Sequence, residues 1–228
     1  MTRPVIGLTA DLRDDCLTVG ADYVRAIERA GGDSMILPVG RGASALAERC
    51  DGVLFTGGRD PATEAFGQST HPAARLMDPR RQESDLALLA QCYASDLPAL
   101  GVCLGMQLMG LRAGARLEQH LDDVLDRPQL HTNDHVHLVE GTHLAGPVTS
   151  AHHQALATPG GLEVVARAPD GVIEAILDPS RRFWLGVQWH PERTADEDLG
   201  LGVVRRLVAA AAGQVVRRTG MDLKEGGS

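Results

Sequence analysis

The chain is 228 residues long and carries a formal net charge of −8 at pH 7, from 22 basic and 30 acidic residues. That length suits a single compact α/β domain, which we place at residues 1–212. The acidic balance excludes the basic footprint of a nucleic-acid or membrane-surface binder. The N-terminal segment has no long apolar stretch, and no apolar run approaches the roughly 18 residues of a membrane span. We therefore expect a cytoplasmic protein without nucleic-acid or membrane partners.

The first half of the chain alternates short apolar runs with amphipathic segments, a pattern typical of βαβ units in a parallel sheet. Helices are expected at residues 22–30, 43–49 and 80–94, and strands at residues 5–9, 34–37, 53–56 and 99–102. Another helix is predicted to begin at Leu104. The proline-containing segment 59–79 is predicted to be a long loop, and loops of this length are usually functional or mobile.

After Gly114 the pattern changes to shorter strands separated by turns, predicted at residues 116–118, 135–139, 163–168, 172–177 and 183–187. These strands are expected to be largely antiparallel or mixed. A final helix is predicted at 199–212, and the polar residues 213–228 are expected to form a flexible tail. The fold class is therefore α/β and flavodoxin-like, with a mostly parallel central sheet flanked by helices and a smaller antiparallel or mixed portion.

A buried strand is predicted to run directly into a helix at the motif GVCLGMQ, residues 101–107. Cys103 occupies the corner, and Gly101 and Gly105 flank it with the spacing of a nucleophile elbow, where side chains would collide as strand and helix pass. The unpaired N–H groups and positive dipole end of the helix starting at Leu104 favour a thiolate. Cys103 is therefore the candidate nucleophile.

A candidate base lies in the motif GVQWHPE, residues 186–192. His190 follows the predicted strand 183–187, and Pro191 ends that strand because proline cannot donate a ladder hydrogen bond. The turn can bring Glu192 back onto the His190 imidazole, where it would fix the tautomer and stabilise the imidazolium. Cys103, His190 and Glu192 would then form a catalytic triad.

A third motif, FTGGRD at residues 55–60, ends a short apolar strand with two glycines. Paired glycines let the backbone approach a ligand closely. The N–H of Gly58 is predicted to join that of Leu104 in an oxyanion hole, with Gly57 beside the substrate.

These motifs, together with SAHHQA at residues 150–155, resemble the class I glutamine amidotransferase superfamily, and within it most closely the γ-glutamyl-γ-aminobutyrate hydrolase family. The likeness runs from the first predicted strand to about residue 212. It implies a hydrolase that cleaves a γ-glutamyl amide, a small-molecule substrate, through a cysteine thioester. It also implies roles in amine or polyamine catabolism, with Cys103 as nucleophile, His190 as general acid and base, and Glu192 as its orienting partner.

The same resemblance implies that Gln107 and the side chains of His152, His153 and Gln154 face the glutamyl group. One position departs from the pattern, because members of that hydrolase family usually carry arginine directly after the nucleophile and this chain has Leu104. Leucine there is more similar to the glutaminase subunits of biosynthetic amidotransferases. We expect the change to shift preference away from an acidic amine such as γ-aminobutyrate, toward neutral or cationic amines.

Six of the nine histidines lie between His131 and His153. His135 and His137 share one face of a predicted strand, and His131 or a later histidine would complete a metal site. However, no carboxylate stands in an obvious position to complete a hydrolytic centre, and such pairs also occur on exposed strands. The four cysteines show no C-x-x-C spacing, so neither a disulfide framework nor a zinc site is indicated by them. We expect no bound metal and no cofactor.

Three other functions stay open. The chain could be a glutaminase subunit that passes ammonia to a synthetase partner, or a metal-dependent hydrolase that uses the histidines at 131–153. It could also be a binding or regulatory protein on an amidotransferase scaffold, for which a complete triad is evidence against. A homodimer is compatible with the sequence, and the released amine is not identified by it.

Overall fold

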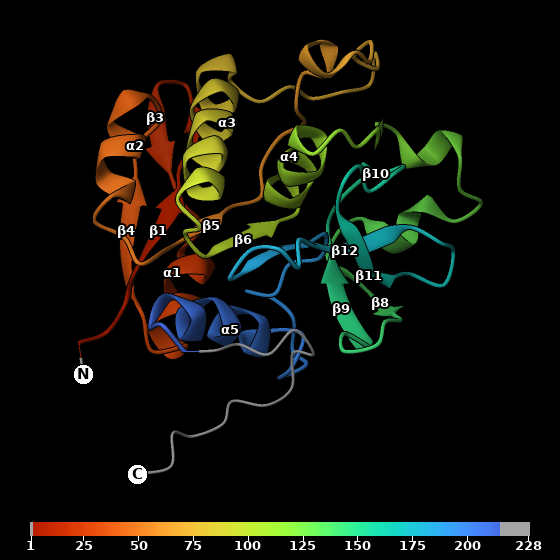
Figure 1. Ribbon diagram of the computed structural model, residues 1–228. Coiled ribbons are helices and arrows are strands. Elements are labelled where there is room, and N and C mark those ends of the chain that lie inside the picture. Colours follow the sequence, from red (N-terminus) through yellow and green to blue (C-terminus); the bar gives the residue numbers. More distant parts are fainter. Residues whose placement is uncertain (1, 215–228) are drawn as a thin grey trace.

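The computed structural model describes residues 2–214 and builds them around a seven-stranded sheet (Figure 1). In spatial order the strands are β11 (Glu163–Arg167), β12 (Ile173–Leu177), β13 (Trp184–Val187), β6 (Ala99–Val102), β5 (Gly52–Phe55), β1 (Val5–Thr9) and β4 (Asp33–Leu37). The run from β13 to β4 is parallel, and β11 and β12 add an antiparallel edge. The predicted α/β class, with a parallel centre and a mixed C-terminal portion, is confirmed.

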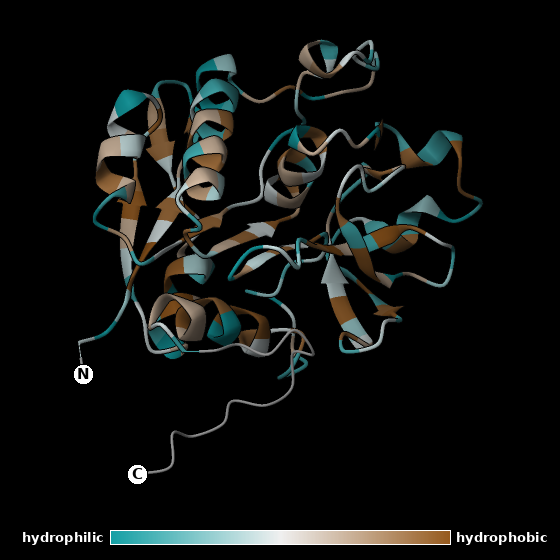
Figure 2. Ribbon diagram, viewed as in Figure 1, coloured by the Kyte–Doolittle hydropathy of each residue, from teal (hydrophilic) through white to brown (hydrophobic). Residues whose placement is uncertain are grey.

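Helices cover both faces of this sheet (Figure 1). On one face lie α1 (Ala21–Arg29) and α5 (Leu201–Ala211), and on the other α2 (Arg41–Ala47), α3 (Pro79–Ala94) and α4 (Leu104–Arg112). Each face therefore has its own hydrophobic cluster, because side chains of successive strand residues point to opposite sides. Figure 2 shows the hydrophobic residues concentrated on the central strands and on the helix sides that face them.

Three two-stranded sheets complete the strands. They pair β2 (Asp11–Arg13) with β3 (Cys16–Thr18), β8 (His135–Val139) with β9 (Gly146–Ser150), and β7 (Leu117–Glu118) with β10 (Ala155–Leu156). Short 3₁₀ turns occur at η1 (Glu64–Phe66), η2 (Leu121–Asp123) and η3 (Pro128–His131). None of the helices in residues 2–214 is both long and apolar enough to cross a membrane.

The predicted helices and strands are all present, with ends shifted by at most two residues. Sequence reasoning missed the β2–β3 hairpin because its turn is Asp14-Asp15, both at positive φ, a conformation normally signalled by asparagine or glycine. It also missed β9, whose Gly146 and Pro147 argue against a strand but are tolerated in a two-stranded ribbon without a central position. The predicted tail lies almost wholly outside the described residues.

The contact between α4 and β5 yields a stability prediction. A Cβ at Gly105 would lie 2.3 Å from the Phe55 carbonyl oxygen, a backbone atom that cannot move aside cheaply. We expect Gly105→Ala to destabilise the protein by about 3 kcal/mol, at the upper end of overpacking effects. Gly161→Ala is the matched control, since its nearest new contact is 3.7 Å away, and urea unfolding of both variants measures the difference. Equal unfolding midpoints would contradict the close approach.

Candidate active site

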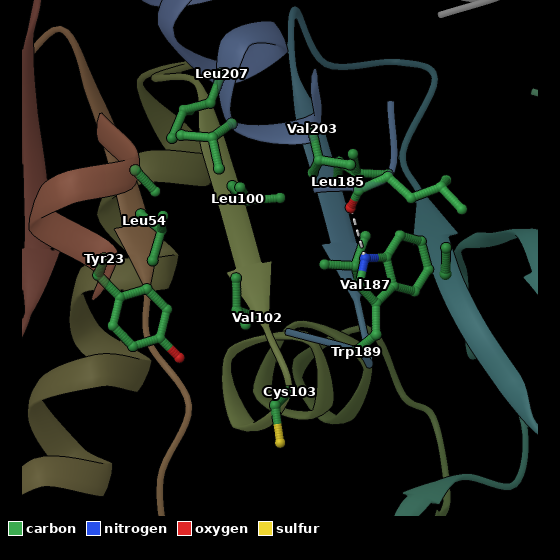
Figure 3. Packing of buried hydrophobic residues seen from close by; sticks show 14 of the residues in the cluster. Tyr23, Leu54, Leu100, Val102, Cys103, Leu185, Val187, Trp189, Val203 and Leu207 are labelled. Carbon is green, nitrogen blue, oxygen red and sulfur yellow. Dashed lines mark hydrogen bonds between the residues drawn. The ribbon is translucent and has the colours of Figure 1, made fainter. Parts of the chain in front are cut away.

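Cys103 lies at the corner between β6 and α4, where its backbone has φ +52° and ψ −105°. Left-handed φ values are uncommon for residues other than glycine, and they are typical of a nucleophile elbow. The flanking glycines are required, because a Cβ at Gly101 would lie 2.6 Å from the Gly105 carbonyl carbon. Figure 3 shows the Cys103 sulfur at the end of β6, directed away from the packed core side chains. The structure thus places Cys103 at the strand–helix corner that the motif predicted.

The groups predicted to act together come from three neighbouring strands. β6 carries Cys103 at its carboxyl end, while β13 on one side leads to His190 and β5 on the other leads to Gly57 and Gly58. β13 ends at Val187, and the chain then reaches His190 through single hydrogen bonds, from Gln188 N to Glu174 O and from His190 N to Thr149 O. Since the strands are parallel, their carboxyl ends meet at one edge of the sheet.

His190 and Glu192 contact each other as predicted. The His190 Nδ1 lies 2.7 Å from the Glu192 Oε1, and both side chains are buried. Burial alone would lower the pKa of His190, but the charge of Glu192 and the neighbouring Cys103 thiol outweigh it and raise the pKa to about 9. The imidazolium is thus favoured at neutral pH, and its Nε2 is left available for the thiol side of the cleft.

The loop after β5 supplies one of two free amides beside Cys103. Within residues 2–214, neither the Gly58 N–H nor the Leu104 N–H donates a hydrogen bond. The Gly57 N–H is already used, because it donates to the Tyr23 hydroxyl at 3.0 Å. The Tyr23 phenol is buried beside Glu192, and both effects raise its pKa well above the ordinary value, so it stays neutral. Sequence reasoning missed Tyr23, which reads only as one apolar position of an amphipathic helix.

Arg81 is a second residue that sequence reasoning missed. Its guanidinium is completely buried, and its Nη1 donates to Asp11 Oδ1 at 2.8 Å while its Nε donates to Asp85 at 3.3 Å. The remaining Nη2 donates to the carbonyl oxygens of Thr56 and Gly57 at 3.3 and 3.1 Å. Arg81 therefore holds the backbone that presents the Gly58 N–H, and no motif in the sequence marks it.

A cleft of about 480 Å³ opens in front of Cys103. Cys103, His190, Gly57 and Gly58 line it, together with three arginines, Arg13, Arg59 and Arg193. The Leu104 side chain is buried in the hydrophobic cluster below and does not line the cleft. A larger cavity of about 820 Å³ between β11 and residues 140–144 shares no residue with this cleft.

The segment 151–154 contributes one residue to the cleft wall. Only Ala151 lines the cleft. His152 and Gln154 are buried behind it, and His153 Nε2 lies 3.0 Å from Asp60 Oδ2, which ties the segment to the loop after β5. Gln107 is also buried, and its Nε2 donates to Gln154 O at 3.2 Å. None of the four side chains predicted to face the glutamyl group is among the residues that line the cleft, because they pack behind Ala151 or pair with Asp60.

The fold is shared with solved glutamine amidotransferases. A glutamine amidotransferase from Thermotoga maritima aligns with a TM-score of 0.62 at 15% identity, covering 95% of this chain and 100% of that one. The likeness shows that the chain has the α/β fold of glutamine amidotransferases.

The sequence places the chain in a family. The Peptidase C26 family matches residues 4–192, and the chain belongs to this family. A relative from Mycobacterium tuberculosis named "Putative glutamine amidotransferase Rv2859c" is 35% identical, covering 96% of this chain and 78% of the relative. The γ-glutamyl-γ-aminobutyrate hydrolase PuuD of Escherichia coli K12 is 29% identical, covering 86% of this chain and 89% of that protein. These relatives support a hydrolase or amidotransferase, as the sequence motifs indicated.

Proposed function

We propose that this protein is a cysteine-dependent hydrolase that cleaves a γ-glutamyl amide into glutamate and an amine. The observation that carries the proposal is the strained elbow of Cys103 in a cleft that it shares with His190, itself 2.7 Å from Glu192. A thiol at a helix N-terminus, beside an imidazole oriented by a carboxylate, is the arrangement that nucleophilic acyl transfer requires.

In the first half of the reaction, the Cys103 thiolate attacks the γ-carbonyl carbon and the oxygen becomes an oxyanion. The free N–H groups of Gly58 and Leu104 stabilise that charge. His190 donates a proton to the departing nitrogen, so the C–N bond breaks and a thioester remains. In the second half, His190 accepts a proton from water, which attacks the thioester and releases glutamate and the thiolate.

The test is to incubate the purified chain alone with a panel of γ-glutamyl amides, including glutamine, and to measure glutamate release. Self-sufficient turnover of a γ-glutamyl amine supports the hydrolase. Turnover of glutamine only in the presence of an added synthetase would instead assign a glutaminase subunit, the other function that the structural relatives suggest. No glutamate from any member of the panel, with or without the added synthetase, would contradict both.

The residues that line the cleft change which released amine we expect the protein to prefer. A preference for neutral or cationic amines rests on Leu104, but that side chain is buried away from the cleft, whereas Arg13, Arg59 and Arg193 line it. We therefore infer that an amine carrying a carboxylate is accepted well. Arg59→Ala should lower kcat/KM for γ-glutamyl-γ-aminobutyrate about fivefold more than for a neutral γ-glutamyl alkylamide, since exposed charges interact weakly. Arg49→Ala, in the exposed turn after α2, is the control. An equal loss on both substrates would place Arg59 on the glutamyl group instead.

The buried guanidinium of Arg81 gives a further prediction. Lysine keeps the charge but cannot donate to Asp11, Asp85 and the Gly57 carbonyl together. Arg81→Lys should lower kcat at least about tenfold with a smaller change in KM, because the Gly58 N–H acts on the transition state. Arg80→Lys, one residue earlier on α3 and exposed, is the matched control. A loss confined to KM, or parallel losses in both variants, would contradict the positioning role of Arg81.

A further inference from the structure

A second group of polar side chains lies buried behind the wall of the cleft. His131 at the end of η3, His137 on β8, His152 after β9 and Glu174 on β12 each direct one ligand-type atom toward a common centre. These four atoms all lie within 4.8 Å of one another. The histidine side chains are at most 7% exposed and the Glu174 side chain is 0% exposed. The β8–β9 ribbon lies beside β12 (Figure 1).

The separations of Glu174 from the three histidines match those between neighbouring ligands of one metal ion. Glu174 Oε1 lies 3.3 Å from His131 Nδ1, 3.5 Å from His137 Nε2 and 3.4 Å from His152 Nε2. None of these atoms has a hydrogen-bond partner with acceptable geometry, and neither has Glu174 Oε2. An ion held tetrahedrally at about 2.0–2.1 Å separates neighbouring ligand atoms by roughly 3.3–3.4 Å.

In each of the three histidines, the ring nitrogen that faces away from the centre already has a hydrogen-bond partner. His131 Nε2 lies 2.8 Å from Asp170 Oδ2, His137 Nδ1 lies 2.9 Å from Leu138 O, and His152 Nδ1 lies 2.9 Å from Gln154 O. Carboxylate and carbonyl oxygens only accept, so these nitrogens donate. In a neutral imidazole the inner nitrogen then presents a lone pair to the centre.

Three lone pairs and a carboxylate therefore converge on one buried centre. Buried polar atoms without a hydrogen-bond partner are rare in native proteins. Five such atoms lie together here, so a bound group that satisfies them is expected. Protonating all three imidazoles would place a net positive charge of two in the interior, which is also costly. A divalent cation satisfies all four ligands at once.

We propose that His131, His137, His152 and Glu174 form a closed site for a divalent transition metal, with Zn²⁺ as the preferred ion. Three imidazoles and one carboxylate are a donor set that zinc accepts, and hydrogen-bonded outer nitrogens are the usual second shell of zinc-bound histidine. Four protein ligands leave no position for water, so the site is structural rather than catalytic. The proposal departs from the metal-free expectation drawn from the sequence, because Glu174 completes a set whose histidines alone looked insufficient.

The site would fasten the β8–β9 ribbon to β12 of the central sheet. It would also fix the cleft wall, because His152 directly follows Ala151, and the Gln154 carbonyl accepts the hydrogen bond from Gln107. Metal loss should therefore loosen the wall while leaving the Cys103 elbow intact. This inference does not depend on the proposed γ-glutamyl activity.

The first test is metal content. The chain, reconstituted with Zn²⁺ and desalted, should hold about one equivalent by mass spectrometric elemental analysis. Glu174→Gln and His137→Ala should each lower occupancy at least about tenfold. His135→Ala is the matched control, since His135 is exposed two residues away on the same strand, and it should keep the wild-type content. Asp170→Asn, which acts through His131, should weaken Zn²⁺ binding about 10- to 100-fold.

A second measurement uses the wild-type chain alone, so that a variant that misfolds cannot obscure the result. Chelation should lower the Tm by about 5 °C or more, and added Zn²⁺ should restore it. Reconstitution with Co²⁺ should give the intense visible absorption of tetrahedral cobalt. Less than about 0.1 equivalent of zinc after reconstitution, with an unchanged Tm, would overturn the site. Undiminished binding in Glu174→Gln and His137→Ala would overturn this ligand set. Metal-dependent amide hydrolysis by Cys103→Ala would overturn the structural role.

Discussion

Cys103→Ala should abolish γ-glutamyl amide hydrolysis, lowering kcat at least about 10⁴-fold, because no other group in the cleft can form the thioester. Alanine keeps the Cβ, so the strained backbone between β6 and α4 should persist and the urea unfolding midpoint should stay near that of the wild type. The measurement is steady-state glutamate release, with unfolding of the same preparations as the check on folding.

Cys16→Ala is the matched control, because Cys16 is the exposed cysteine among the four. It should change turnover by no more than about twofold. Brief iodoacetamide treatment near neutral pH should inactivate the protein by labelling Cys103, since burial raises the pKa of Cys50 to about 11 and that of Cys92 to about 12. Residual hydrolysis in Cys103→Ala, or inactivation that maps to another cysteine, would reject the proposed nucleophile.

Glu192→Gln should both slow the reaction and move its pH dependence. Burial opposes the charged form of His190, and the Glu192 carboxylate outweighs burial to raise the pKa to about 9. A thiolate–imidazolium pair stays active while the imidazole is protonated, so kcat/KM of the wild type should fall as pH rises through about 9. Without the carboxylate the His190 pKa drops, and this alkaline limb should move at least about one unit lower.

The same variant should lose roughly a hundredfold or more in kcat at neutral pH, because glutamine cannot stabilise the imidazolium and weakens control of the tautomer. His190→Ala should be the more damaging, since it removes both the proton acceptor and the donor. Full pH profiles of kcat/KM for the three proteins decide the matter. An unshifted alkaline limb in Glu192→Gln, or near-normal turnover in His190→Ala, would contradict this assignment.

The elbow and the triad were predictable because their signals are local. Gly101 and Gly105 are needed by contacts within one strand–turn–helix unit, and Pro191 fixes the return of Glu192 onto His190 two residues away. Hydrophobic periodicity likewise located the helices and the main-sheet strands. A short turn such as Asp14-Asp15 carries a weaker signal, because aspartate reaches positive φ without being selected for it.

The rest of the site depends on contacts between distant segments. Tyr23 contacts Gly57 from α1. Arg81 contacts Asp11 and Gly57 from α3. No motif near either residue in the sequence indicates these contacts. Glu174 shows the same limit, since it joins His131 only after β12 has paired at the sheet edge. Motif spacing reveals catalytic groups that lie close together along the chain. Partners that come from distant segments are recognised only once the fold is known.

The order β13-β6-β5 also bears on how such a protein can change its substrate. The strands that lead to the base, the nucleophile and the oxyanion donor are hydrogen-bonded neighbours, about 4.8 Å apart. The central sheet therefore fixes the spacing of these three groups. Arg13 lines the cleft from the β2–β3 hairpin, which is a separate sheet outside this central set of strands. Substitutions there can retune which amine leaves while the reacting atoms keep their alignment. Chemistry and selectivity are thus free to evolve separately in this scaffold.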